Sequence, residues 1–186
     1  MKTKFFCIKA MFLFSALFLY STMAICGQTP KSGAILPDFT FTSPSMEKDI
    51  QYLGLAGKKD FEFETIEADI MVIEIIGVYC AVCYKQAPQF NKLFKRLKKK
   101  KDTGKIKMLA VAAGGTANEI MMLREKNTYK FPVISDLKYE FHKLLGEPRT
   151  PFTMVVSADG KILDTHLGLI KDMDAFYKKL KKLAKK

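Results

Sequence analysis

The clearest signal along the chain is a set of continuous apolar runs separated by amphipathic segments. Residues 70–76 and 106–112 are almost entirely apolar, which is typical of strands that are buried on both faces of a sheet. Residues 38–42 alternate between polar and apolar side chains, as a half-buried strand does. Together, the apolar runs and the alternation predict strands at 38–42, 70–76, 106–112, 131–134, 152–156 and 161–167.

Helices are predicted between these strands. Phe90, Leu93, Phe94 and Leu97 recur at helical spacing, and Pro88 inside the same segment predicts a kink. Further helices are predicted from a capping box at 116–119 to about 127, from Asp136 to about 146, and over 172–184.

This order of elements predicts an α/β fold. Strands alternate with helices and are followed by a hairpin through 158–160 and by a terminal helix. We expect a three-layer sandwich in which a mixed central β-sheet is flanked by helices. A chain of 186 residues is long enough for one domain with a sizeable core. Residues 43–68 are less regular and predict a hairpin or a loop.

The first 27 residues have the composition of a signal peptide or N-terminal anchor. Basic residues at positions 2, 4 and 9 precede an almost wholly apolar stretch, 10–25. Cleavage after Ala24 or Gly27, lipidation of Cys26 and retention as a membrane anchor are all open. Each route places the following residues on the extracytoplasmic side, in the periplasm or cell envelope. We expect residues 28–34 to form a linker and residues 35–186 to form the folded domain.

The chain is strongly basic, with a formal net charge of +12. Much of the excess positive charge lies in residues 92–107 and in the C-terminal run 178–186. Such stretches attract anionic lipid headgroups or acidic partners, and they equally suit solvated helix faces, which we favour. Nucleic-acid binding is not expected, because the domain is exported and carries no recognition motif.

Two cysteines stand where a predicted strand gives way to a predicted helix, in Cys80-Ala81-Val82-Cys83. The N-terminus of a helix favours a thiolate, and a second cysteine three residues further on is within disulfide reach. This setting predicts a redox-active pair in which one thiol attacks a disulfide and the other resolves the mixed disulfide.

Zinc, copper and an inert disulfide are the alternatives for this pair. A structural zinc site usually has four Cys or His ligands, and no second pair at similar spacing accompanies this one. Cys7 and Cys26 lie in or beside the N-terminal apolar stretch. His142 and His166 stand alone, so we expect structural roles for both and no metal at the pair.

Several motifs resemble the thioredoxin superfamily. Gly77-Val78-Tyr79-Cys80-Ala81-Val82-Cys83 with Pro88 looks like the active-site strand, turn and kinked helix of that family. Residues 131–136 and 149–161, with Pro37-Asp38-Phe39, narrow the resemblance to its exported TlpA/ResA-like redoxin branch. The resemblance covers residues 35 to 184. A peroxiredoxin is not expected, because Gly77 stands where its catalytic Thr would precede the cysteine.

The resemblance implies roles for individual residues. The peptide bond between Thr150 and Pro151 would be cis and would shape a groove in which a substrate strand pairs with the backbone of Thr150. Tyr79, in place of the usual tryptophan, would contact the substrate. Glu74 would be a buried acid that takes a proton from Cys83. The alternatives are a trans Pro151 on an edge strand and a Glu74 that faces solvent.

The resulting hypothesis is an extracytoplasmic thiol–disulfide oxidoreductase that reduces protein disulfides without a cofactor. Cys80 would attack, Cys83 would resolve, and a membrane thiol–disulfide electron donor would re-reduce the pair. The resemblance implies a role in cytochrome c maturation or in general redox homeostasis, and we expect a monomer. A non-enzymatic domain that handles copper or binds a partner is the alternative. The dipeptide Ala81-Val82 leaves the direction of electron transfer open.

Overall fold

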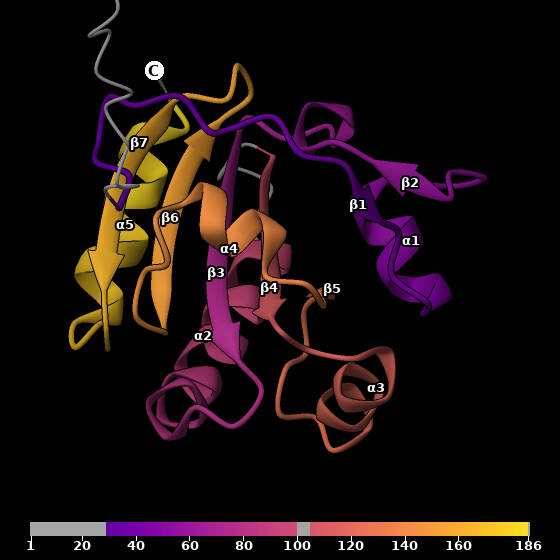
Figure 1. Ribbon diagram of the computed structural model, residues 1–186. Coiled ribbons are helices and arrows are strands. Elements are labelled where there is room, and N and C mark those ends of the chain that lie inside the picture. The colour runs from indigo at the N-terminus through magenta and orange to yellow at the C-terminus, as the bar shows by residue number, and fades with distance from the viewer. Residues whose placement is uncertain (1–28, 100–104, 186) are drawn as a thin grey trace, which may run out of the picture.

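Within the described residues, five strands form the central sheet (Figure 1). The computed structural model describes residues 29–99 and 105–185, so the expected leader over 1–27 lies outside them. The strands are β3 (Ile70–Gly77), β4 (Ile106–Ala113), β5 (Val133–Asp136), β6 (Phe152–Ser157) and β7 (Ile162–Leu167). Their order is β5-β4-β3-β6-β7, parallel from β3 through β5 and antiparallel from β3 through β7. The predicted mixed sheet is therefore confirmed.

Helices cover both faces of this sheet. They are α1 (Glu47–Leu53), α2 (Ala81–Lys99), α3 (Ala117–Glu125), α4 (Glu140–Leu144) and α5 (Met173–Leu183). Alternate residues of β3 point to opposite faces: Val72 packs with α2, α3 and α5, whereas Ile73 packs with α1 and α4. In Figure 1, α4 lies in front of the sheet and α5 behind it. The three-layer sandwich is thus confirmed. No helix within 29–99 or 105–185 is long and apolar enough to cross a membrane.

The predicted helix starts are largely confirmed. The Thr116 side chain accepts the N–H of Glu119, and the Glu119 carboxylate accepts the N–H of Thr116, so a capping box opens α3. α5 begins within a residue of the predicted start, and the Asp172 side chain caps it. The helix expected over 136–146 is shorter, because α4 begins only at residue 140, yet the Asp136 carboxylate accepts two backbone N–H groups of α4.

The segment 43–68 contains a helix that the sequence pattern did not predict. β1 (Phe41–Thr42), just before this segment, pairs antiparallel with β2 (Asp60–Phe61) inside it, and a short 3-10 helix η1 (Phe63–Thr65) follows. The strand expected over 38–42 is reduced to its last two residues. α1 lies between β1 and β2, and no side chain caps its first turn, so its sequence carries little helix signal.

Tertiary contacts hold α1 beside β4. Because β5 pairs with β4 only over residues 110–113, the first half of β4 has no strand neighbour on that side within 29–99 and 105–185. The Tyr52 hydroxyl accepts the N–H of Met108 at 2.9 Å, and Lys107 Nζ donates to the Leu53 carbonyl at 3.2 Å. The Tyr52 hydroxyl therefore satisfies a backbone N–H of β4 that a further strand would otherwise pair, while the Leu53 carbonyl binds a side chain of the same strand.

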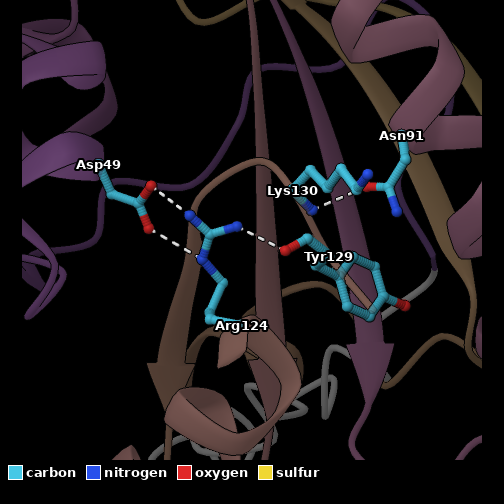
Figure 2. Close-up of polar contacts among 5 residues, drawn as sticks. All are labelled: Asp49, Asn91, Arg124, Tyr129 and Lys130. Carbon is cyan, nitrogen blue, oxygen red and sulfur yellow. Dashed lines mark hydrogen bonds and ion pairs between the residues drawn. The ribbon is translucent and has the colours of Figure 1, made fainter. Parts of the chain in front are cut away.

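A buried ion pair ties α1 to α3 (Figure 2). Asp49 accepts two hydrogen bonds from the guanidinium of Arg124, one of them from Nε at 3.0 Å. The Asp49 and Arg124 side chains are 6% and 2% exposed. Arg124 also donates to the carbonyl of Tyr129, so the same guanidinium fixes the chain that leads into β5.

Part of the expected linker over 28–34 is hydrogen-bonded to the sheet. Gly33 donates its N–H to the Ile162 carbonyl at 2.8 Å, and Ile162 donates to the Ala34 carbonyl at 2.8 Å. Ser32 Oγ donates to the carbonyl of Leu163 at 2.8 Å. Contacts with β7 therefore begin several residues before position 35.

Replacing Arg124 with Met should lower the free energy of unfolding by about 3–5 kcal/mol, because the Asp49 carboxylate would stay buried without its partner. Urea unfolding of the oxidised protein measures the loss. The matched control is Glu67→Gln, which breaks an exposed pair with Lys105 and should change stability by less than about 1 kcal/mol. An Arg124→Met variant as stable as the wild type would contradict the structural role of this pair.

Candidate active site

The two cysteines lie at the carboxyl end of β3, the central strand. After Gly77 the chain turns, and the N–H of Cys80 donates to the Gly77 carbonyl at 3.1 Å. Cys80 directly precedes the first residue of α2, and Cys83 lies in its first turn. The two residues form a disulfide with a Cα–Cα distance of 5.2 Å. The predicted pairing at a strand-to-helix junction is therefore present.

The two sulfur atoms differ in exposure and in surroundings. Cys83 is 2% exposed and packs in the core, whereas Cys80 is only partly buried. The backbone N–H of Cys83 points at Cys80 Sγ from 3.1 Å. After reduction, this N–H and the positive end of α2 would favour negative charge on Cys80 Sγ. Cys80 is thus the more accessible of the two sulfur atoms and Cys83 the more buried one.

A proline loop closes over Cys80 from the start of β6. The peptide bond between Thr150 and Pro151 is cis, as the resemblance implied. The Thr150 carbonyl oxygen lies 3.5 Å from Cys80 Sγ. A Cβ at Gly77 would lie 3.4 Å from both Cys80 Cβ and Thr150 Oγ1, so the absence of a side chain at Gly77 lets these segments approach closely.

Glu74 is buried in the middle of β3, so the solvent-facing alternative is wrong. Its side chain is fully buried, with Ala110 and Thr153 as its neighbours on the adjoining strands. Neither carboxylate oxygen has a hydrogen-bond partner among the described residues. Burial raises the pKa of Glu74 to about 8. Glu74 points to the same face of the sheet as Val72, which is the face that α2 and Cys83 cover.

Three further polar side chains lie in the same layer as Glu74 and Cys83. Gln86 is completely buried, and its carbonyl oxygen accepts a backbone N–H from the loop before α5 at 3.0 Å. Thr153 stands opposite Glu74 in the β3–β6 register. The Tyr129 hydroxyl lies 3.5 Å from the Cys83 carbonyl, and burial, followed by the Glu74 charge, raises the pKa of Tyr129.

The sequence-based prediction missed these three residues for different reasons. Gln86 comes three positions after Cys83 on the apolar stripe of α2, so helical spacing alone could have identified it as a polar group behind the cysteines. Thr153 and Tyr129 reach this layer through the β3–β6 register and through the loop before β5. No local pattern could have placed them there.

Tyr79 is the most exposed side chain next to the cysteines, at 80% exposure. Its hydroxyl donates to Glu119 Oε1 at 2.6 Å, and the other carboxylate oxygen, Oε2, accepts from both the backbone N–H and the hydroxyl of Thr116. The Tyr79 hydrogen bond, followed by those from Thr116, lowers the pKa of Glu119. The ring is therefore tethered to the start of α3 while its surface stays open to solvent, and Glu119 is a partner that the sequence did not indicate.

The two histidines lie on different elements, and each contacts a backbone carbonyl. His142 is on α4 and contacts the Pro148 carbonyl at 2.9 Å, and His166 is on β7 and contacts the Leu169 carbonyl at 3.2 Å. Within 29–99 and 105–185, no three or more His, Cys, Asp or Glu residues are grouped so that they could hold a metal ion. Cys7 and Cys26 lie outside the described residues.

Comparison with known proteins agrees with this arrangement. The chain is 27% identical to the thiol-disulfide oxidoreductase ResA of Bacillus thuringiensis subsp. konkukian over 109 residues. This matched stretch covers 59% of this chain and 60% of that protein. The match thus spans about three fifths of the length of this curated relative.

Solved structures show the same fold at low identity. The thioredoxin domain of a thiol-disulfide oxidoreductase from Bacteroides vulgatus superposes with a TM-score of 0.62 at 14% identity, covering 83% of this chain and 99% of that one. StoA from Bacillus subtilis superposes with a TM-score of 0.55 at 17% identity, covering 81% and 98%. The Redoxin family model matches residues 31–180. With the cysteine pair, the cis proline and the sheet order in place, the chain belongs to the redoxin family of the thioredoxin superfamily.

Proposed function

We propose that the protein is an extracytoplasmic thiol–disulfide oxidoreductase that reduces disulfides in proteins. The observation that carries this proposal is the unequal pair of cysteines, with Cys80 accessible at the start of α2 and Cys83 buried behind it. The apolar leader over 1–27 supports an extracytoplasmic location. The resemblance to ResA, named a thiol-disulfide oxidoreductase, supports the reaction type.

The backbone of Thr150 is the proposed docking point for the substrate. Its carbonyl faces Cys80 Sγ, and its N–H has no hydrogen-bond partner among the described residues. An extended substrate segment can therefore pair with this residue and bring its own disulfide to Cys80. The exposed rings of Tyr79 and Tyr84 flank the cysteines, and they offer apolar contact to the residues beside the substrate cysteine.

The reaction proceeds in two exchanges. Cys80 thiolate attacks one sulfur of the substrate disulfide, an S–S bond forms between them, and the other substrate sulfur leaves as a thiolate that takes up a proton. Cys83 then loses its proton and attacks Cys80 Sγ, which expels the second substrate thiol and closes the Cys80–Cys83 disulfide. The substrate gains two electrons, the dithiol loses two, and a membrane thiol–disulfide donor returns them.

Glu74 is the proposed proton acceptor for Cys83. Its carboxyl lies in the core layer that contains Cys83, and its pKa of about 8 is close to that of an ordinary thiol, about 8.5. Proton exchange between groups of similar pKa has little thermodynamic cost. Only the ionised fraction of Glu74 can accept the proton, so this assistance should increase as the pH rises toward 8.

Replacing Cys80 with Ser should reduce the rate of insulin reduction in the presence of dithiothreitol to the uncatalysed level, because the attacking sulfur is lost. Replacing Cys83 with Ser should stop turnover after the first exchange and leave a Cys80–substrate mixed disulfide, visible by mass spectrometry. A Cys80→Ser variant that still reduced insulin at the wild-type rate would refute the mechanism.

Glu74 should also make stability depend on pH. Its carboxyl ionises near pH 4.5 in the unfolded chain and near pH 8 in the folded protein, so the unfolded state holds fewer protons between these values. Stability should therefore fall across this window, by up to ~1.4 kcal/mol per pH unit from this group. Glu74→Gln should flatten the dependence in urea unfolding of the oxidised protein at pH 5 and pH 8. Equal slopes for both proteins would show that Glu74 is not buried.

The reduction potential of the Cys80–Cys83 pair tests the direction of transfer. A reductase should have a potential of about −270 mV or lower, because a dithiol gives up its electrons more readily when the disulfide that it forms is stable. Equilibration with glutathione or dithiothreitol buffers, followed by quantification of the free thiols, measures it. A potential near about −120 mV would reverse the assignment and make the protein an oxidant.

A further inference from the structure

A lysine-rich groove runs along α2, on the side away from α5. Its volume is about 840 Å³, and it lies between α2 and the segment 127–130 that leads into β5. Tyr84, the residue after Cys83, lines one end of this lysine groove, and Lys99, at the end of α2, lines the other. The groove therefore starts beside the cysteine pair and extends away from it.

Specific contacts hold the segment 127–130 against α2, and Figure 2 shows two of them, Asn91 with Lys130 and Arg124 with Tyr129. Asn91 of α2 accepts the N–H of Lys130 at 2.7 Å and donates to the carbonyl of Thr128 at 2.9 Å. On the far side of the same segment, buried Arg124 donates to the carbonyl of Tyr129. These bonds fix the second wall against α2, so the groove is part of the folded scaffold.

The charge of the groove has one sign. No acidic residue is among its described lining. Five lysines line it: Lys92, Lys95, Lys98, Lys99 and Lys130. No ion pair within 29–99 or 105–185 neutralises any of these five side chains. α2 as a whole contains no Asp or Glu. A positive potential therefore builds up in a concave space, where field lines are focused.

Apolar surface lies between the lysines. Tyr84, Pro88 and Phe94 line the lysine groove, and Tyr84 is 42% exposed. The Lys98 ammonium lies 5.4 Å from the centre of the Phe94 ring, so part of this cationic rim packs on an aromatic floor. A ligand that carries both carboxylates and apolar side chains matches this lining better than a small inorganic anion does.

A second groove on the other side of α2 gives a useful contrast. It has a volume of about 650 Å³, and two carboxylates, Asp172 and Asp174, line it together with three cations, Lys92, Arg96 and Lys171. Arg96 is already paired with Asp174 at 2.5 Å. Carboxylates thus offset most of the positive charge in the second groove, whereas the described lining of the lysine groove contains none.

We propose that the lysine groove docks an acidic, extended segment of the protein whose disulfide Cys80 attacks. This proposal rests on the proposed function. From Tyr84 to Lys99 the helix rises about 22 Å at ~1.5 Å per residue, which matches roughly seven residues of extended chain. The acidic segment therefore lies within about ten residues of the substrate cysteine. Docking raises the local concentration of the disulfide at Cys80 and speeds the first exchange.

A peptide fits this groove better than a membrane surface does. The groove is a concave space between α2 and residues 127–130, and its lysines line the hollow together with aromatic side chains. A lipid bilayer presents a broad, flat array of charges that cannot enter such a space. The lysines of α5, such as the exposed Lys178 and Lys182, lie outside the groove and provide a matched control of equal charge.

Binding is tested with the full-length oxidised protein and a fluorescent, cysteine-free peptide of ten residues in which Glu alternates with Leu or Phe. We expect Lys95→Glu/Lys99→Glu to weaken binding by about tenfold or more in fluorescence anisotropy, and Lys178→Glu/Lys182→Glu to change it less than about twofold. Lys95→Gln/Lys99→Gln should show an intermediate loss. Equal losses in the groove and α5 variants, or no binding by the wild type, would overturn the proposal.

The link to catalysis is tested with two disulfide peptides that differ only in a flanking segment, alternating Glu in one and Gln in the other. The wild type should reduce the Glu peptide about tenfold faster, and Lys95→Glu/Lys99→Glu should remove that preference while keeping the rate for the Gln peptide. Absence of a preference in the wild type would overturn the proposal. Failure to reduce either peptide, with peptide binding intact, would refute the reductase function alone. Tighter groove-dependent binding to phosphatidylglycerol vesicles than to the peptide would assign the lysines to a membrane and overturn the proposal.

Discussion

β3 is hydrogen-bonded to a strand on each side and buried on both faces, and this double constraint positions the candidate active site. A strand held in this way can neither slip in register nor rotate, because either change would move its apolar residues or its backbone bonds out of place. Its carboxyl end therefore delivers Cys80 to one position relative to β6, and β6 carries Thr150 and Pro151 at its own start. The accessible sulfur and the backbone of Thr150 are therefore fixed relative to each other by one pair of antiparallel strands.

The layer behind Cys83 has a composition that stability alone does not explain. Glu74, Gln86 and Thr153 each bury at least one polar atom without a partner among the described residues. Each such atom costs about 1–3 kcal/mol, and apolar side chains in the same places would cost nothing of this kind. Their concentration on the α2 face, at the level of the buried cysteine, fits a layer that exchanges protons with Cys83.

Local sequence patterns predicted the parts of the fold that local physics determines. β3, the start of α2 at the cysteines and the capping box at Thr116 all have signals within a few residues, and the family resemblance supplied the cis bond before Pro151. α1 has no such signal, because its position depends on an Asp49–Arg124 pair that is 75 residues apart in sequence. The burial of Glu74 could be predicted only in part. The apolar residues around it suggested a buried strand, but only the position of β3 in the middle of the sheet shows that solvent is excluded from this side chain.

The contact between Tyr52 and Met108 has a consequence for how copies of this protein behave toward one another. A strand with unpaired N–H and carbonyl groups is a template on which a second chain can add its own strand. β5 is too short to cover all of β4, and α1 lies beside the remaining half, where its Tyr52 hydroxyl accepts the Met108 N–H that a foreign strand would otherwise bond. The segment between β1 and β2 therefore covers part of a strand edge at which a second copy of the chain could otherwise add a strand of its own.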